Sequence, residues 1–303
     1  MSKRRELETE VHFQSSSGSR VWLYQEDCLQ GMTRRLEPDS VSLVVTSPPY
    51  NLGTAYGTYD DTIPRQDYLS WLGEWAQRLK EVLHPDGSLF LNIGSRPADP
   101  WVPFDVVQRI RSHLVLQNVI HWVKSIYINH SSYGKRQEAN VGHYKPVNSR
   151  RFLNDSHEYI FHLSHSGRVP LDRLAVGVPY KDRSNVGRWA RAKAGVRCRG
   201  NCWYVPYPTI LRRDRDRPHP ATFPPLLADM CIRLHGLAQT RLVLDPFMGI
   251  GNSALACRDL GVDFVGFEVD PLYFQEAWRR VRTEQGRLGF PSKEGPEASA
   301  TER

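Results

Sequence analysis

The regular alternation of short apolar segments with segments of helical spacing constrains the fold of this chain more than any other feature. The apolar segments predict strands at residues 20–25, 41–47, 88–94, 118–128, 158–163, 241–245 and 263–268. Helical spacing predicts helices at residues 67–83, 104–114, 223–237, 252–261 and 271–282, and residues 84–87 are expected to form a turn. Strands that alternate with helices form a mostly parallel sheet with helices on both faces. We therefore predict an α/β fold with a doubly wound, mostly parallel sheet.

The net charge of +7 is concentrated in one segment of the 303-residue chain. Ser164–Pro218 contains thirteen Lys or Arg residues against four Asp residues, so its positive excess is larger than that of the whole chain. Solvated surfaces usually mix both signs, whereas a block of one sign indicates a polyanionic partner, most simply nucleic acid. The segment has no clear period and interrupts the alternation, so we interpret it as an inserted subdomain or large loop.

Composition points to a protein of the cytoplasm. No apolar run approaches the length of a membrane span, and the N-terminus has no apolar core after its basic residues. The five cysteines are few and scattered, which fits a reducing compartment. Cys198 and Cys202 have no second pair of ligands near them, so we expect no metal site. Residues 1–18 and 286–303 are expected to be disordered.

The segment LVLDPFMGIGNSALA predicts a strand, a tight turn and a helix. Its two glycines allow the backbone to bend and to approach a ligand closely, and Asn252 or Ser253 can cap the helix. Glu268 ends the next strand, where an acid can accept both hydroxyls of a ribose. The pattern fits a nucleoside-containing cofactor, but it also matches the G-x-G-x-x-A fingerprint of nicotinamide and flavin enzymes. Asp245 at the turn disfavours a pyrophosphate and is compatible with a cationic methionine group.

The segment TSPPYN, residues 46–51, follows an apolar strand and must end it, because Pro48 and Pro49 have no N–H to donate. It forms a rigid knuckle at the strand end. The knuckle holds a hydroxyl, a carbonyl and an aromatic ring, those of Ser47, Pro48 and Tyr50, at the end of the strand.

Taken together, TSPPYN and DPFMGIGNS resemble the catalytic and cofactor motifs of the DNA amino-methyltransferases, which use S-adenosyl-L-methionine. The catalytic motif precedes the basic segment and the cofactor motif follows it, an order that resembles the beta class. GHYKPVNSRRFLNDSHEYIFHLS and HPATFP also resemble segments of this family. The resemblance extends over residues 21–282. It implies a class I methyltransferase fold of Rossmann-like type, circularly permuted, with an inserted basic target-recognition region.

This resemblance divides the chain and assigns roles to its residues. It implies a catalytic half at residues 19–163, a target-recognition insert at 164–218 and a cofactor-binding half at 219–285. The implied catalytic residues are Ser47, Pro48, Pro49 and Tyr50. An exocyclic amine of a base is a poor nucleophile until two acceptors on its hydrogens free its lone pair, and the resemblance implies that Ser47 Oγ and the Pro48 carbonyl are these acceptors, with Tyr50 stacked on the base. The implied cofactor-binding residues are Asp27, Cys28, His219, Thr222, Asp245, Phe247, Gly249, Gly251, Asn252 and Glu268. The candidate DNA-contacting residues are Arg183, Arg188, Arg191, Lys193, Arg197, Arg199, Arg212 and Arg213.

Within the cofactor set, the resemblance places each residue at one part of the ligand. Gly249 and Gly251 are expected under the methionine part. Glu268 is expected at the ribose and Asp27 at the adenine amino group. His219 is expected, together with Thr222, near the methionine carboxylate.

The activity implied is methyl transfer to an exocyclic amine in double-stranded DNA, after the target nucleotide has been flipped out of the stack. In the family, Ser at the first position of the knuckle goes mostly with cytosine N4 and Asp mostly with adenine N6. Ser47 therefore predicts N4-methylcytosine, with N6-methyladenine as the alternative. A cytosine C5 methyltransferase would need a Pro-Cys pair, which the chain lacks. The resemblance to restriction–modification enzymes leaves open a homodimer and a cognate restriction endonuclease acting on the same site.

Two other classes of protein fit part of the sequence. A nicotinamide-dependent oxidoreductase fits the glycine turn but leaves TSPPYN and the basic segment unexplained. A nucleic-acid-binding protein without enzymatic activity fits the charge but leaves the cofactor motif without a role.

Overall fold

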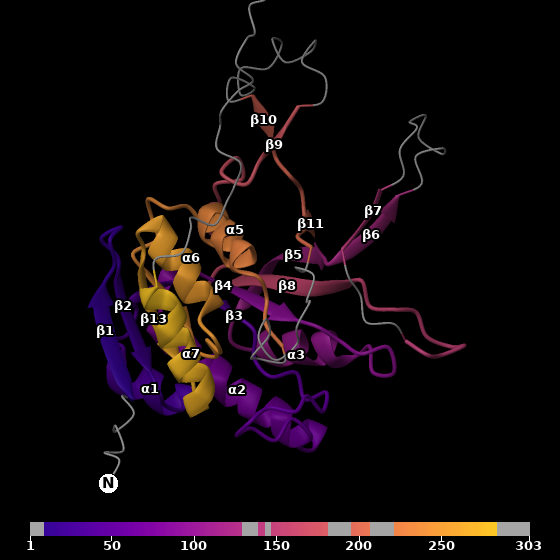
Figure 1. The fold of residues 1–303 in the computed structure, drawn as a ribbon, viewed down its shortest axis with the longest axis horizontal. Helices are drawn as coiled ribbons and strands as arrows, with labels where there is room; N and C mark the ends of the chain where they lie inside the picture. Colours follow the sequence, from indigo (N-terminus) through magenta and orange to yellow (C-terminus); the bar gives the residue numbers. More distant parts are fainter. Residues whose placement is uncertain (1–8, 129–138, 143–146, 181–194, 207–220, 284–303) are drawn as a thin grey trace, which may run out of the picture.

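The computed structural model describes residues 9–128, 139–142, 147–180, 195–206 and 221–283 (Figure 1). The strands are β1 (Glu10–Gln14), β2 (Arg20–Tyr24), β3 (Val41–Thr46), β4 (Leu83–Ile93), β5 (Val115–Val123), β6 (Ser125–Ile128), β7 (Ala139–Gly142), β8 (His157–Ser164), β9 (Val178–Pro179), β10 (Val196–Arg197), β11 (Cys202–Tyr204), β12 (Leu242–Asp245) and β13 (Asp263–Phe267). The helices are α1 (Cys28–Arg35), α2 (Arg65–Val82), α3 (Val102–Ile110), α5 (Pro225–His235), α6 (Asn252–Leu260) and α7 (Pro271–Arg282).

Nine of the described strands form one sheet in the order β1-β2-β13-β12-β3-β4-β8-β5-β11. The five strands from β2 to β4 in this order are parallel, whereas β1 at the edge and β8 between β4 and β5 are antiparallel to their neighbours. The last two strands of the chain, β12 and β13, lie between the early strands β2 and β3. The sheet is therefore mostly parallel, as the alternation predicted, and circularly permuted, as the resemblance implied.

Helices cover both faces of this sheet (Figure 1). On one face, α1, α2 and α3 bury side chains such as Met32, Trp75 and Val106 against the sheet. On the other face, α5, α6 and α7 do the same with side chains such as Ile232 and Phe274. The doubly wound arrangement predicted from the alternation is thus confirmed. None of the helices in the described part of the chain is long and apolar enough to cross a membrane.

The expected disorder of residues 1–18 is wrong for β1. Glu10–Gln14 pairs along its whole length with Arg20–Tyr24, and Val11 is buried. Phe13 lies 5.4 Å from Trp278 of α7, measured between ring centroids. The sequence of β1 alternates polar and apolar residues, but the strand is too short for this period to stand out. Residues 1–8 and the predicted disordered tail, 286–303, lie outside the described residues.

Three local predictions also differ from the structure. The strand expected at 118–128 breaks at Lys124 into β5, which pairs with β8, and β6, which pairs with β7. The turn expected at 84–87 is a bulge within β4, since Val41 pairs with Leu83 and Leu43 already pairs with Ser88. Helix α1 was not predicted, because it is short and buries few of its residues.

The basic segment at 164–218 is not wholly separate from the sheet. Its strand β11 pairs in parallel with β5, and Trp203 on β11 is buried in the core. In contrast, β9 and β10 pair only with each other and project beyond the sheet (Figure 1). Residues 181–194 and 207–220 of the segment lie outside the described residues. A strand of three residues in a Gly- and Arg-rich context carries no period from which β11 could be predicted.

A buried hydroxyl joins the two sides of the fold through two histidines. Ser88 Oγ of β4 lies 3.0 Å from His162 Nε2 of β8 and 3.2 Å from His235 Nδ1 of α5. Asn118 Nδ2 lies 3.0 Å from the other ring nitrogen of His162. Burial lowers the pKa of His162 to about 3 and that of His235 to about 4. Both rings are therefore neutral in the folded protein at neutral pH.

This cluster predicts loss of stability in mild acid. In the unfolded chain the histidines bind protons below their ordinary pKa of about 6.5, whereas in the folded protein they stay neutral down to about pH 4. The free energy of unfolding should therefore fall as the pH is lowered from 6.5 to 4, by an amount on the order of a few kcal/mol. His235→Gln should show a shallower fall in melting temperature over this range than wild type, and the exposed His84→Gln should not. If the melting temperatures of wild type, His235→Gln and His84→Gln fell in parallel with pH, the acid sensitivity could not be assigned to the buried histidines.

Candidate active site

A pocket opens at the carboxyl ends of β2, β3, β12 and β13. Its walls come from the residues that follow these four strands, from the loop at 51–63, from Trp71 of α2 and from residues 221–223. In a doubly wound sheet, ligands bind at this edge, because the loops there diverge to the two faces. The pocket lies between β12 and β3, where the direction of the chain connections changes.

The TSPPYN knuckle forms one end of this pocket. Ser47, Pro48, Pro49 and Tyr50, the predicted catalytic residues, all line it. Tyr68 Oη of α2 donates a 2.8 Å hydrogen bond to the Pro49 carbonyl, which fixes the second proline. No hydrogen bond from the described residues reaches the Pro48 carbonyl, so this oxygen is available as an acceptor.

Asp245 connects the knuckle to the glycine turn. Thr46 Oγ1 donates a 2.7 Å hydrogen bond to Asp245 Oδ1, and Ser253 Oγ of α6 donates to Oδ2. The backbone N–H of Phe247 also donates to Oδ1, at 3.1 Å. Burial raises the pKa of Asp245 to about 6, while these donors act in the opposite direction. This carboxylate therefore holds the ends of β3 and β12 and the start of α6 in one arrangement.

The two glycines of the turn have different surroundings. Gly249 has a φ of 51° and lines the pocket, and its N–H donates a 2.9 Å hydrogen bond to Glu268 Oε2. Gly251 has a φ of 78° and does not line the pocket. A Cβ atom on Gly251 would lie 3.1 Å from Ala277 Cβ and 3.3 Å from Val281 Cγ2, both on α7. Gly251 thus permits close packing of α7. Its expected place under the methionine part of the cofactor stays a prediction.

The predicted cap of α6 is wrong. The helix begins after Gly251 with no side-chain cap. Asn252 lines the pocket, but its Nδ2 donates to the Phe223 carbonyl at 2.6 Å, and its Oδ1 accepts from Arg280 Nη1 at 2.8 Å. Ser253 is engaged by Asp245. Both side chains are used to hold neighbouring segments, so neither turns back onto its own helix.

Glu268 lies in the pocket wall at the end of β13, as predicted. Its Oε2 accepts from Gly249, and its Oε1 accepts a 2.8 Å hydrogen bond from the N–H of Asp270. Burial raises the pKa of Glu268 to about 7. Each carboxylate oxygen has lone pairs beyond the one used by the backbone, so both remain able to accept a ribose hydroxyl.

Asp27 and Cys28 line the pocket at the end of β2. Asp27 Oδ1 caps α1 by accepting from the N–H groups of Leu29, at 3.0 Å, and Gln30, at 3.1 Å. Its Oδ2 has no hydrogen-bond partner among the described residues. Cys28 is buried, and burial raises the pKa of its thiol, so it is present as the thiol. This end of the pocket therefore offers a carboxylate oxygen of Asp27 beside the apolar side chains of Phe267 and Val269.

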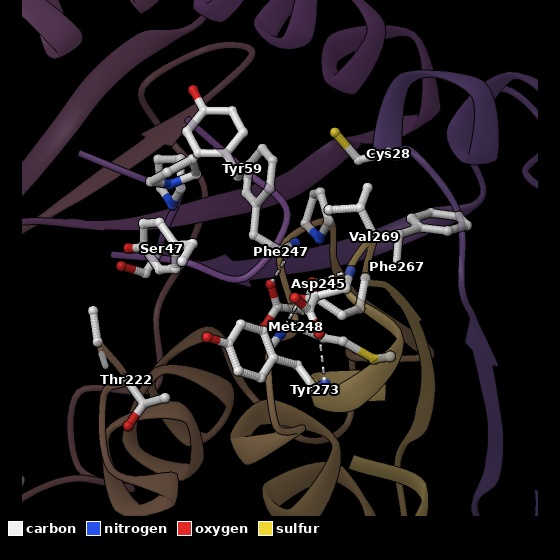
Figure 2. A pocket seen from close by; sticks show the side chains of 18 of the residues that line it. Cys28, Ser47, Tyr59, Thr222, Asp245, Phe247, Met248, Phe267, Val269 and Tyr273 are labelled. Carbon is white, nitrogen blue, oxygen red and sulfur yellow. Dashed lines mark hydrogen bonds between the residues drawn. The ribbon is translucent and has the colours of Figure 1, made fainter. Parts of the chain in front are cut away.

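Figure 2 shows how the labelled side chains divide the pocket. Cys28, Phe267 and Val269 lie toward one side, and Ser47 and Thr222 lie toward the opposite side, with Phe247 between them. The side near Cys28 is the nucleoside end expected from the resemblance. The side near Ser47 is the end at which transfer is expected.

An aromatic wall closes this pocket, and the sequence did not indicate it. It consists of Tyr56, Tyr59, Trp71 and Phe247, with ring centroids 5.6–6.4 Å apart between neighbours. Tyr59 Oη is buried and has no partner within the described residues. The ring of Tyr59, rather than its hydroxyl, therefore forms part of the pocket wall.

The buried Asp61 holds the loop that carries Tyr56 and Tyr59. Its carboxylate accepts hydrogen bonds of 2.8–3.1 Å from the backbone N–H groups of Asn51, Leu52 and Thr54. The only sequence signal was the local cluster of Gly, Thr, Tyr and Asp after the knuckle, which is also typical of a surface loop.

The remaining predicted site residues are distributed as follows. Thr222 lines the pocket, and His219 lies outside the described residues. Among the candidate DNA contacts, Arg197 is exposed on β10, and Arg199 is half-buried with its Nε donating to the Val176 carbonyl at 2.9 Å. Arg199 is therefore at least partly structural. The other candidates, Arg183, Arg188, Arg191, Lys193, Arg212 and Arg213, lie outside the described residues.

Comparison with known proteins agrees with this architecture. A family model described as DNA methylase matches residues 41–279. The type II methyltransferase M.HpaI of Haemophilus parainfluenzae is 26% identical over 251 residues, which cover 83% of this chain and 71% of that protein. The type II methyltransferase M.SmaI of Serratia marcescens is 27% identical over 270 residues, which cover 81% of this chain and 86% of that protein.

Solved structures share the fold. The cytosine-N4-specific PvuII DNA methyltransferase superposes with a TM-score of 0.63 at 19% identity, covering 90% of this chain and 91% of that one. A DNA modification methylase from Thermus thermophilus, solved in complex with S-adenosyl-L-methionine, superposes with a TM-score of 0.54 at 23% identity. It covers 86% of this chain and 92% of that one.

The environment of Gly251 predicts that Gly251→Val acts on stability before it acts on ligand binding. The substitution places a branched side chain at positive φ and against α7, and should lower the free energy of unfolding by about 2–4 kcal/mol. Gly18→Val is a matched control, because Gly18 also has a positive φ, of 90°, but would contact nothing within 4 Å. Denaturant unfolding of the ligand-free proteins compares them. Equal losses would show that contact with α7 contributes nothing.

Proposed function

The chain belongs to the N6/N4 DNA methylase family, and on that premise we propose that it methylates the exocyclic N4 amine of cytosine in double-stranded DNA, with S-adenosyl-L-methionine as methyl donor. The observation that carries this proposal is the position of Ser47 and Pro48 at one end of a pocket whose other end suits a nucleoside. Two acceptors beside a nucleoside pocket are what transfer to an amine requires.

The residues of the pocket fit S-adenosyl-L-methionine. The adenine amino group would donate to Asp27, and the ribose hydroxyls would donate to Glu268. The aromatic wall of Tyr56, Tyr59, Trp71 and Phe247 would cover the ligand. Thr222 and Gly249 would lie along the methionine part. When bound, this cofactor supplies a methyl group already activated by its sulfonium, so no covalent enzyme intermediate is needed.

The knuckle would activate the amine. Its lone pair is conjugated into the ring, and Ser47 Oγ and the Pro48 carbonyl would accept its two hydrogens and favour tetrahedral nitrogen. Tyr50 would offer its ring as a stacking platform for the flipped base. Much of the remaining catalysis is positioning, which the Thr46–Asp245 bond supports by fixing the knuckle against the cofactor turn.

The basic segment would bind the DNA. The candidate contacts Arg183, Arg188, Arg191, Lys193, Arg197, Arg212 and Arg213 would neutralise phosphates and read bases, with Arg199 contributing less because its side chain is engaged by the protein. A duplex substrate must release the base into the pocket, at a cost of a few kcal/mol. The proposed location is the cytoplasm, and a homodimer or a cognate endonuclease remains compatible with this function.

The choice of cytosine over adenine rests on Ser47 alone. In proteins that this chain resembles, Ser at this position goes mostly with cytosine N4. Adenine N6 is the second candidate, because the pocket and the basic segment would serve both bases. The two are distinguished by the product.

We predict that DNA from cells expressing the protein contains N4-methylcytosine, because Ser47 occupies the first position of the knuckle. Nucleoside mass spectrometry of digested DNA measures this directly, with DNA from cells expressing Ser47→Ala as the control for background modification. N6-methyladenine alone would exclude the cytosine assignment and leave the amino-methyltransferase intact. If the DNA contains neither product although the protein is folded and binds the cofactor, both the cytosine and the adenine assignments are excluded.

We predict that S-adenosyl-L-methionine raises the melting temperature and that NAD does not. A ligand that binds only the folded state at 100 times its Kd stabilises it by about 2.7 kcal/mol. Glu268→Gln replaces one acceptor by a donor and should weaken cofactor binding about 10-fold to 100-fold, whereas Glu81→Gln on the exposed side of α2 should not. Stabilisation by NAD would favour the oxidoreductase instead.

A further inference from the structure

A cluster of polar side chains lies behind the knuckle, and no role has so far been given to it. Lys124 Nζ lies 2.9 Å from Glu158 Oε1. The other carboxylate oxygen of Glu158, Oε2, accepts from Tyr50 Oη at 3.0 Å and from Asn92 Nδ2 at 2.8 Å. Tyr50 Oη in turn lies 2.9 Å from Ser47 Oγ. A chain of hydrogen bonds thus leads from an ion pair to the hydroxyl that lines the pocket.

The carboxylate of Glu158 is ionised although it is largely buried. Its side chain is 13% exposed, and that of Lys124 is 17% exposed. Burial by itself would raise the pKa of Glu158, but Lys124, Asn92 and Tyr50 together hold that pKa below its ordinary value. An ionised carboxylate has no hydrogen to donate, so every neighbour must donate to it.

This restriction fixes the direction of the whole chain of hydrogen bonds. Tyr50 has one hydroxyl hydrogen and gives it to Glu158. Between Ser47 and Tyr50, the hydrogen must then come from Ser47. Asn92 Nδ2 adds to this, since it donates to Tyr50 Oη at 2.7 Å as well as to Glu158. With its hydrogen turned inward, Ser47 presents only lone pairs to the pocket.

We infer that Glu158 is a positioning residue, whose ionised carboxylate acts through Tyr50 to keep the Ser47 hydroxyl an acceptor toward the target amine. If the hydrogen bonds were not directed toward Glu158, the hydroxyl hydrogen of Ser47 could point toward the base. It would then repel the amine hydrogens, and Ser47 would not accept a hydrogen bond from them. The inference rests on the proposed function, because it concerns the amine that Ser47 would meet. It adds Glu158, Lys124 and Asn92 to the residues on which transfer depends.

A purely structural role does not explain the charge. Neutral, well-packed side chains of similar volume often replace a buried ion pair at no loss of stability. A charged pair retained directly behind an acceptor hydroxyl therefore suggests a use for its charge. Lys124 keeps Glu158 ionised, and Glu158 sets the direction of the hydrogen bonds.

The first test is a double-mutant cycle in single-turnover methylation. Glu158→Gln should lower the rate about 10-fold to 100-fold, with affinities for S-adenosyl-L-methionine and for DNA within about twofold of wild type. Tyr50→Phe keeps the ring but removes the link, so Glu158→Gln should slow Tyr50→Phe little further. Glu276→Gln, which removes an ion-paired carboxylate from the surface of α7, should match wild type. Additive effects in the cycle would overturn the inference.

A second variant guards against misfolding of Glu158→Gln. Lys124→Met removes the cation that keeps Glu158 ionised, so the pKa of Glu158 should rise, and the transfer rate should increase with pH as Glu158 loses its proton. The other charged or titratable groups facing this carboxylate are Asp155 and His157, with His121 beside His157. The double variant Lys124→Met, Glu158→Gln keeps these three groups and lacks only the carboxyl group of Glu158. The added pH dependence should therefore disappear in it, because that dependence comes from Glu158.

A pH profile of Lys124→Met that coincides with that of wild type would also overturn the inference. Melting temperatures of all variants, with and without cofactor, show that the proteins are folded and bind the methyl donor. Failure of the proposed function would look different. Wild type itself would then methylate neither cytosine nor adenine, whereas a wrong inference about Glu158 leaves methylation by wild type intact.

Discussion

Asp245 accepts hydrogen bonds from Thr46 on one oxygen and from Ser253 on the other, in a place without access to water. Burying a carboxylate is unfavourable unless donors surround it, and these two donors come from two separate segments, β3 and α6. Thr46 is the residue before Ser47, and the residues after Asp245 form the cofactor turn. One buried carboxylate therefore sets the distance between the acceptors of the knuckle and the floor of the pocket, and the other contacts of the site are built around that distance.

Other residues that line the pocket near Asp245 also stabilise the fold. Glu268 offers oxygens to the pocket while accepting N–H groups from Gly249 and Asp270, and Asp27 does so while capping α1. Gly251 also serves the fold, because it lets α7 approach. Removal of such a side chain changes the shape of the pocket together with its chemistry. Measurements of binding alone would not separate the two effects, and isosteric substitutions are needed.

The architecture could be predicted from the sequence because it depends on the periodicity of apolar residues and on the order of strands and helices along the chain. Strands with continuous apolar runs and helices with one apolar face are visible without structure, and the position of β12 and β13 followed from the resemblance. Motif residues were found where proline or glycine fixes the backbone. The cluster of Glu158, Lys124 and Asn92 could not be found, since its members come from three strands or strand ends and meet only in the folded sheet. The different roles of Gly249 and Gly251 depend on α7, which no local pattern describes.

The permuted order of the strands has a consequence for synthesis of the protein on the ribosome. Thr46 and Asp245 are 199 residues apart. At roughly 5–20 residues per second, roughly 10–40 s pass between the emergence of one partner and that of the other. During that interval β2 and β3 have been made but the two strands that separate them have not, so both present unpaired edges. The nascent chain is therefore exposed to wrong pairing at the centre of its future sheet, and the last quarter of translation must close the gap.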